Sequence, residues 1–203
     1  MIKKYECDIR GFRVIAGALD RHAQAAILAD VERVCTHAPP FSPLTGWGKP
    51  MSVRITSAGK YGWYSDKNGY RYITKHPSGV PWPPIPISVL DVWKAHAASP
   101  RPPDCCLINH YNEKARMGLH QDKDETDFSS PVVSISLGDP GLFRIGGVSR
   151  ADPTESIWLE SGTVVVMGGA ARLAFHGIDR IRFGGSTLVS GGGRINLTLR
   201  VVD

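Results

Sequence analysis

The sequence predicts a mainly β fold with flanking helices, and three observations support this fold class. From Cys105 onward, short apolar stretches alternate with Gly, Pro and Asp turns, which is typical of β-sandwiches and barrels. Before that point, two stretches have the apolar spacing of helices. Five prolines between Pro77 and Pro86 exclude regular structure there. The length of 203 residues suits one domain with a full-sized core.

The N-terminal half is expected to begin with one helix over residues 13–37. Asp20 is a candidate N-cap, and the apolar positions that recur at helical spacing are Ile27, Leu28, Val31 and Val34. Residues 44–76 alternate loosely and contain five glycines, which favours short strands and hairpins. A second short helix is expected over residues 87–98, ended by Pro100.

The C-terminal half is expected to consist of short strands joined by turns. Seven candidate strands are Leu107–Tyr111, Val132–Leu137, Leu142–Ile145, Ser156–Leu159, Thr163–Met167, Ala174–His176 and Arg194–Val202. Seven strands at this spacing, with turn residues between them, indicate an all-β sandwich or barrel.

Composition is that of a globular chain, with 42% hydrophobic and 21% charged residues. No apolar run approaches the roughly 18 residues that a membrane span requires, and no apolar block follows the first lysines. We therefore expect a cytoplasmic protein with no membrane partner. The four cysteines lack CxxC spacing, and we interpret them as buried free thiols rather than as a zinc site or a disulfide framework.

The excess positive charge is concentrated in one window. The whole chain has a formal charge of +5, and residues 44–76 hold six basic residues against Asp66 alone, which is also 6 − 1 = +5. The same window contains six of the 17 aromatic residues. Cations among aromatics suit a polyanion that carries flat bases, because cations neutralise phosphates and aromatic rings stack on bases. A solvated basic face over an aromatic hairpin is the simpler alternative.

The last predicted strand has an unusual polar face. Alternation in Arg-Ile-Asn-Leu-Thr-Leu-Arg places four polar side chains on one side: Arg194, Asn196, Thr198 and Arg200. An exposed edge strand would also have a polar face. Two arginines beside an amide and a hydroxyl are nevertheless well suited to a small dicarboxylate. Asn109 and Tyr111 share a face of another strand and could add donors.

A candidate metal site follows from three further residues. His120 and Asp122 stand two positions apart, and His176 follows a predicted strand 54 residues after the aspartate. Two histidines and one carboxylate form the facial triad of non-haem iron(II) oxygenases, which leaves open positions for a co-substrate and oxygen. An isolated His-x-Asp pair is common, so the interpretation depends on its combination with the arginine strand. His110 lies on the opposite face from Asn109 and is not expected to be a ligand.

These motifs together resemble the AlkB family of nucleic-acid demethylases, which depend on iron(II) and 2-oxoglutarate. The segments that carry the resemblance are Leu107-Ile-Asn-His-Tyr, Leu119-His-Gln-Asp-Lys-Asp-Glu, Ser134-Ile-Ser-Leu-Gly, His176-Gly-Ile and Arg194-Ile-Asn-Leu-Thr-Leu-Arg. The close resemblance covers residues 104–202, and a looser one extends back to about Gly46. Met167 departs from it, because an aromatic residue is expected there.

The resemblance implies a double-stranded β-helix (jelly-roll) dioxygenase core in residues 104–203. Residues 1–103 would supply N-terminal helices and a nucleotide-recognition lid at about 44–76, packed on the core as a single compact unit. The implied activity is oxidative demethylation of 1-methyladenine- and 3-methylcytosine-type bases in DNA, with RNA as a further substrate class, in the repair of alkylation damage. Formaldehyde would be released and 2-oxoglutarate converted to succinate. A monomer is expected.

The resemblance also implies roles for individual residues. Iron(II) would bind His120, Asp122 and His176. The 2-oxoglutarate contacts would be Asn109, Tyr111, Arg194, Asn196, Thr198 and Arg200, with each arginine's carboxylate unassigned. The substrate contacts would be Met51, Trp63, Tyr70, Arg71, Tyr72, Asp124, Glu125 and Arg150.

Three other functions fit part of the pattern. An oxygenase of the same superfamily could act on a protein side chain or a small molecule. A nucleic-acid-binding module with a decayed active site would be expected to have lost some of the triad or arginine residues, and none is lost. A cupin-like binding protein would not require two arginines on the final strand.

Overall fold

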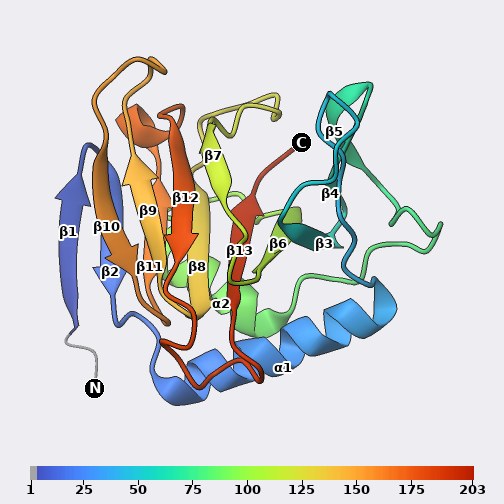
Figure 1. The fold of residues 1–203 in the computed structure, drawn as a ribbon, viewed down its shortest axis with the longest axis horizontal. Helices are drawn as coiled ribbons and strands as arrows, with labels where there is room; N and C mark the ends of the chain where they lie inside the picture. Colours follow the sequence, from blue (N-terminus) through green and yellow to red (C-terminus); the bar gives the residue numbers. More distant parts are fainter. Residues whose placement is uncertain (1–3) are drawn as a thin grey trace.

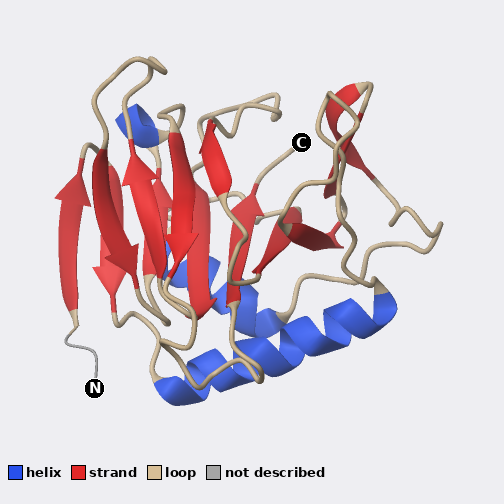
Figure 2. Cartoon of the chain, viewed as in Figure 1, coloured by secondary structure: helices blue, strands red, loops and turns tan. Residues whose placement is uncertain are grey.

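Two antiparallel sheets form the body of the protein, whose computed structural model describes residues 4–203 (Figures 1 and 2). The larger sheet has seven strands in the spatial order β1 (Tyr5–Ile9), β2 (Phe12–Ala16), β11 (Val164–Met167), β8 (Val132–Gly138), β13 (Arg194–Arg200), β6 (Cys105–Tyr111) and β3 (Arg54–Gly59). The smaller sheet has the order β10 (Glu155–Leu159), β9 (Gly141–Ile145), β12 (His176–Ile181) and β7 (Met117–His120). This is the expected jelly roll.

Strand alternation divides the core into two layers on either side of the larger sheet. On β11, Val165 and Met167 face the smaller sheet and pack in one apolar cluster with Phe143 and Ile145. Val164 and Val166 belong to the other cluster, which joins the larger sheet to the helices. A strand buried on both faces reads as a continuous apolar run, which is why Val-Val-Val-Met shows no polar alternation.

Helices α1 (Arg21–His37) and α2 (Ile87–His96) cover the outer face of the larger sheet, and Figure 1 shows α1 running beneath it. The Asp20 carboxylate accepts a hydrogen bond from the Ala23 backbone N–H at 2.8 Å, so Asp20 is the N-cap. The predicted helix over 13–37 was therefore wrong in its first part, where strand β2 lies instead. Gly17, with φ of 64°, separates β2 from the helix. No helix within residues 4–203 has both the length and the apolar character needed to cross a membrane.

A separate hairpin stands at one end of the sheets and corresponds to the predicted lid. It consists of β4 (Gly62–Asp66) and β5 (Gly69–Ile73), and Figure 1 shows it rising beside the C-terminus. The segment before it is tied to β4, because Leu44 and Ser65 exchange two hydrogen bonds. The hairpin thus overhangs the end of the larger sheet at which β13 finishes.

The structure differs from the predicted division at residue 103. Strands β1, β2 and β3 precede that residue, yet they form both edges of the larger sheet. The first 103 residues therefore contribute to the jelly roll as well as to the lid. Strand β7, which ends at His120, was not among the predicted strands, and β12 begins at His176, where a predicted strand ended. The remaining C-terminal strands and α2 agree with the predictions within two residues.

Candidate active site

A cavity of about 540 Å³ lies between the sheets and extends to the lid hairpin, a size typical of small-molecule sites. It collects most of the residues that the sequence singled out. The candidate metal ligands and 2-oxoglutarate contacts in its wall are Asn109, Tyr111, His120, Asp122, His176, Arg194, Asn196, Thr198 and Arg200. The candidate substrate contacts in its wall are Met51, Trp63, Tyr70, Asp124 and Arg150.

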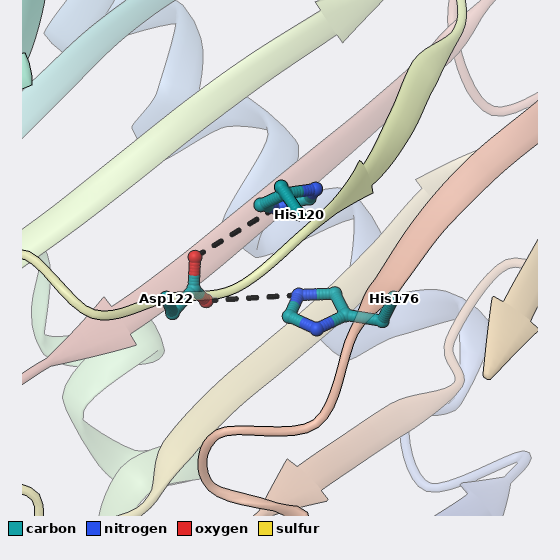
Figure 3. A group of neighbouring side chains, drawn as sticks. All are labelled: His120, Asp122 and His176. Carbon is teal, nitrogen blue, oxygen red and sulfur yellow. Dashed lines mark ion pairs between the residues drawn. The ribbon is translucent and has the colours of Figure 1, made fainter. Parts of the chain in front are cut away.

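Three candidate metal ligands of the cavity wall point toward one another, as Figure 3 shows. The Nε2 atoms of His120 and His176 lie 3.7 and 3.8 Å from the two carboxylate oxygens of Asp122. His120 and His176 are direct cross-strand partners of β7 and β12, and their ring centroids are 4.6 Å apart. One ligand atom from each residue lies within 4.8 Å of the others, which suits a single metal ion.

Backbone carbonyls fix the orientation of both imidazoles. Nδ1 of His120 donates to the Gly118 carbonyl and Nδ1 of His176 donates to the Ala174 carbonyl, each at 3.0 Å. Nε2 is consequently the atom that remains to bind a metal. Burial, with a smaller contribution from the neighbouring His120, lowers the pKa of His176 to about 4. His176 is therefore neutral near pH 7, which is the form that binds metals.

Asp122 is buried and remains ionised because of its contact with Arg200. Burial alone would raise the pKa of its carboxyl, but the charge and the hydrogen bond of Arg200 hold that pKa well below its usual range. The Arg200 guanidinium donates to Oδ1 of Asp122 at 2.7 Å. This contact fixes Oδ1, the oxygen nearer to His120, and leaves Oδ2 to face His176.

Arg194 is buried in the cavity wall and makes no ion pair with a carboxylate within residues 4–203. It is 1% exposed and donates to the Leu159 carbonyl and the Ser136 hydroxyl. Its Nε has no hydrogen-bond partner within residues 4–203. Burial lowers the pKa of Arg194 to about 10, so the guanidinium is still charged near pH 7. A buried, incompletely paired cation of this kind indicates a binding position for an anion.

Polar side chains continue from Arg194 along the cavity. The Thr198 hydroxyl and the Asn109 side-chain amide donate to Oδ1 of Asn196, at 3.1 and 3.5 Å, and Oδ1 of Asn109 has no partner within residues 4–203. Within the same residues, the hydrogen-bond partner of the Tyr111 hydroxyl is the sulfur of Met117, at 3.8 Å. These groups could still bond to a ligand.

The lid supplies an aromatic wall at the cavity mouth. The rings of Trp63 and Tyr70 are stacked, with centroids 5.4 Å apart and planes 24° apart. The indole N–H of Trp63 donates to the Asp124 carboxylate at 2.9 Å. Tyr70 is 57% exposed, so this stack reaches the solvent. An aromatic stack next to a carboxylate suits a flat cationic ligand.

Three further residues complete the cavity wall. Met51 lies on the segment before β3, and Arg150 donates to the Leu119 carbonyl at 3.1 Å. Met167, which replaces the aromatic residue expected from the family resemblance, is 3% exposed at the end of β11. Its flexible thioether leaves a differently shaped wall from the one that a rigid ring would form.

Three residues expected to contact substrate lie outside the cavity wall. Both guanidinium NH groups of Arg71 donate to Asp66, at 2.8 and 2.9 Å, on the exposed side of the hairpin. Tyr72 and Glu125 instead form a hydrogen bond to each other at 2.7 Å, behind the cavity. The sequence placed these residues in the lid and next to Asp124 correctly, but it could not indicate which way each side chain points.

Two residues of the site were missed in the sequence. Arg172 is 4% exposed and donates to the Asp122 carbonyl and the Glu125 carboxylate. Ser136 accepts a hydrogen bond from Arg194 at 2.8 Å. The alternation of Ser134-Ile-Ser136 carries a signal for the serine, because a polar pair on a buried strand suggests an internal partner. Arg172 follows Gly-Gly-Ala-Ala and has no such signal.

His110 is not among the metal ligands that the structure brings together. Its Nε2 lies 3.6 Å from the Cys35 sulfur of α1, on the helix side of the larger sheet. The prediction that His110 faces away from Asn109 is therefore confirmed.

Comparisons with known proteins agree with this arrangement. Residues 11–200 match the model of the 2OG-Fe(II) oxygenase superfamily. The alpha-ketoglutarate-dependent dioxygenase AlkB homolog of Caulobacter vibrioides is 54% identical over 201 residues, which cover 98% of this chain and 91% of the relative. The alpha-ketoglutarate-dependent dioxygenase AlkB of Escherichia coli is 40% identical over 184 residues, which cover 88% of this chain and 85% of the relative.

A solved structure described as "The structure of OsALKBH1" superimposes with a TM-score of 0.82 at 32% sequence identity. The match covers 97% of this chain and 100% of that chain. The similarity therefore extends over the lid as well as both sheets.

Proposed function

This chain belongs to the 2OG-Fe(II) oxygenase superfamily and, within it, to the AlkB family, and from that premise we propose how its cavity performs the reaction. The activity is oxidative demethylation of alkylated nucleic-acid bases. The residue assignments depend on one observation. The His120–Asp122–His176 cluster and the Trp63–Tyr70 stack line the same cavity. We propose bases of the 1-methyladenine and 3-methylcytosine type in DNA as substrates, with RNA as a second class.

The two histidines and Asp122 would hold iron(II) through Nε2 of each ring and one carboxylate oxygen. Iron(II), together with 2-oxoglutarate and O2, would supply the oxidant that hydroxylates the N-methyl carbon, with succinate and CO2 as co-products and formaldehyde leaving from the hydroxymethyl group. The chain contributes two oriented imidazoles and a carboxylate that Arg200 holds ionised. The apolar residues around this cluster shield Asp122 and His176 from bulk water.

The structure supports different roles for the two arginines of β13. Arg200 already pairs with Asp122 and Glu125, so its charge is balanced within the protein. Arg194 has no such carboxylate partner within residues 4–203, whereas the Nε atom lacks a hydrogen bond in both arginines. We therefore assign Arg194 to the carboxylate of 2-oxoglutarate remote from the metal, with the Tyr111 hydroxyl as a second donor. Asn109 and Asn196 would contact the rest of the co-substrate.

The lid would hold the base. A methyl group on the Watson–Crick edge is reachable only when the base is unpaired or flipped out of the duplex. The Trp63–Tyr70 wall would replace lost stacking, and the positive charge of a methylated base adds a cation–π contribution. Asp124, which Trp63 orients, would accept a hydrogen bond from the exocyclic amine that both proposed bases carry. All these residues come from one chain, so we expect a monomer to be active.

The test is turnover of a 3-methylcytosine oligonucleotide with iron(II), 2-oxoglutarate and O2. We expect restored cytosine and formaldehyde in equal amounts, and no product from His120→Ala. Comparison of the turnover rates on matched single-stranded DNA, duplex DNA and RNA substrates identifies the preferred nucleic acid. An enzyme specialised for a protein side chain or a small molecule would leave the methylated base intact, and its activity would depend little on salt.

A further inference from the structure

The lid is joined to the metal site by a buried polar cluster, of which Tyr72, Glu125 and Arg172 lie outside the cavity wall. The Tyr72 hydroxyl on β5 donates to Oε1 of Glu125 at 2.7 Å. The other carboxylate oxygen of Glu125 accepts from Arg172 at 3.1 Å, and Nε of Arg200 lies 3.4 Å from Oε1. Arg200 in turn donates to the metal ligand Asp122 at 2.7 Å.

This cluster connects four segments that are distant in the sequence. Tyr72 belongs to the lid, Asp122 and Glu125 to the loop after β7, Arg172 to the turn after 3-10 helix η1 (Gly169–Ala171), and Arg200 to the end of β13. The two arginines and two carboxylates balance in charge, and their side chains are at most 7% exposed. Buried ionic groups with several partners have few alternative positions, because any displacement leaves a charge unpaired.

The lid contacts the same loop at a second point that lies in the cavity. Trp63 donates to Asp124, the residue before Glu125, and Trp63 is also the direct cross-strand partner of Tyr72. A base that stacks on Trp63 and bonds to Asp124 contacts the hairpin and this loop together, so its binding depends on how the two are placed relative to each other. The buried Tyr72 hydroxyl links that placement to the metal site, because it donates to Glu125 and also accepts from the Arg200 guanidinium at 3.4 Å.

We propose that the Tyr72–Glu125 hydrogen bond couples base binding at the lid to the geometry of the metal site. Glu125 and Tyr72 are positioning residues in this account. The inference builds on the proposed function, because it assumes that the base binds beside Trp63. Coupling is reciprocal, so the loaded metal site strengthens base binding by the same factor by which the base strengthens metal and co-substrate binding.

The experiment measures the affinity of a 3-methylcytosine oligonucleotide for the whole chain, without turnover. Binding is compared for metal-free protein and for protein loaded with manganese(II) and 2-oxoglutarate without oxygen. For the wild type we expect loading to tighten binding about 5- to 20-fold, within the usual range of coupling between sites. For Tyr72→Phe, which loses only the hydroxyl, we expect metal-free affinity near the wild-type value and a loading effect of less than about 2-fold.

Tyr61→Phe is the matched control. Its hydroxyl also belongs to the lid region and donates to a carboxylate, but that carboxylate is Asp203, outside the cluster. We expect this variant to keep the wild-type loading effect. Circular dichroism and thermal unfolding of the three proteins verify that each is folded.

The proposal is overturned if loading with metal and 2-oxoglutarate leaves the oligonucleotide affinity of the wild type unchanged. It is also overturned if loading tightens binding to Tyr72→Phe as much as to the wild type. Neither result touches the proposed function, which is judged by wild-type turnover. Conversely, a wild type that fails to demethylate the oligonucleotide contradicts the proposed substrate. The reciprocal measurement is 2-oxoglutarate affinity with and without oligonucleotide, and it should show the same ratio.

Discussion

At the scale of single residues, the buried cation Arg194 is expected to determine the affinity for 2-oxoglutarate. Its guanidinium lies in the cavity wall with two neutral acceptors and no adjacent carboxylate. We expect Arg194→Met to raise the KM for 2-oxoglutarate roughly 10- to 100-fold, because a charge-assisted hydrogen bond contributes about 1.5–3 kcal/mol. Steady-state kinetics with varied 2-oxoglutarate measure this effect.

Arg71→Ala serves as the comparison, since Arg71 pairs with Asp66 on the exposed side of the lid. That variant should keep the wild-type KM for 2-oxoglutarate. If both variants shift KM equally, Arg194 has no special role in holding the co-substrate.

His110 makes stability depend on pH. Burial lowers its pKa from 6.5 to about 4, and the charge of Arg54 contributes to the shift. Between these values the unfolded chain binds a proton that the folded chain does not, so the free energy of unfolding decreases as pH falls from about 6.5 to about 4. The loss attributable to this residue is at most about 3 kcal/mol.

We expect the free energy of unfolding in urea to decrease for the wild type between about pH 7 and about pH 4.5. For His110→Gln it should decrease less over the same interval. The metal-free protein is used for both, so that metal release does not contribute. Identical pH dependence in the two proteins would rule out His110 as the cause.

Sequence patterns were most informative where a residue's role depends on its own strand. Alternation on β13 correctly places Arg194, Asn196 and Arg200 in the cavity. It could not place Tyr72 or Glu125, because their directions depend on partners more than 40 residues away. The apolar residues of β2 were assigned to a helix because a short apolar run fits either structure until its neighbours are known.

At the scale of elements, the charge of the lid is less uniform than its sequence suggests. Lys60 pairs with Asp203 and Arg71 with Asp66, whereas Lys49, Lys67 and Lys75 are exposed and make no ion pair within residues 4–203. We therefore expect the latter three to contact phosphates. Their triple alanine variant should bind a methylated single strand more weakly, with a salt dependence reduced by up to about 2 logarithmic units per decade of salt.

The matched variant is Lys60→Ala, whose charge is already neutralised by Asp203. Its affinity and salt dependence should remain close to those of the wild type. Fluorescence anisotropy at several salt concentrations measures both slopes. A triple variant with the wild-type slope would mean that phosphates lie elsewhere.

At the scale of the whole molecule, the strands that precede residue 104 are part of the oxygenase body. Strands β1 and β2 continue the larger sheet beyond β11, and β3 closes its opposite edge beside β6. Helices α1 and α2 cover the outer face, where Ile135, Leu197 and Leu199 are fully buried. The motif-bearing residues 104–203 therefore depend on the first half of the chain for both edges and one face of their main sheet.

This dependence predicts that the fragment 104–203 does not fold, although it contains every candidate metal ligand. Without the first half, two inner strands become unpaired edges and the apolar face toward the helices meets water, which favours aggregation. We expect the fragment to lack a cooperative thermal transition and to bind no manganese(II) at concentrations that saturate the whole chain. Adding back residues 1–103 as a separate polypeptide should restore both properties if pairing of the sheet edges is what the fragment lacks. A fragment that unfolds cooperatively by itself would show instead that the remaining strands of the larger sheet and the smaller sheet are sufficient for an independent core.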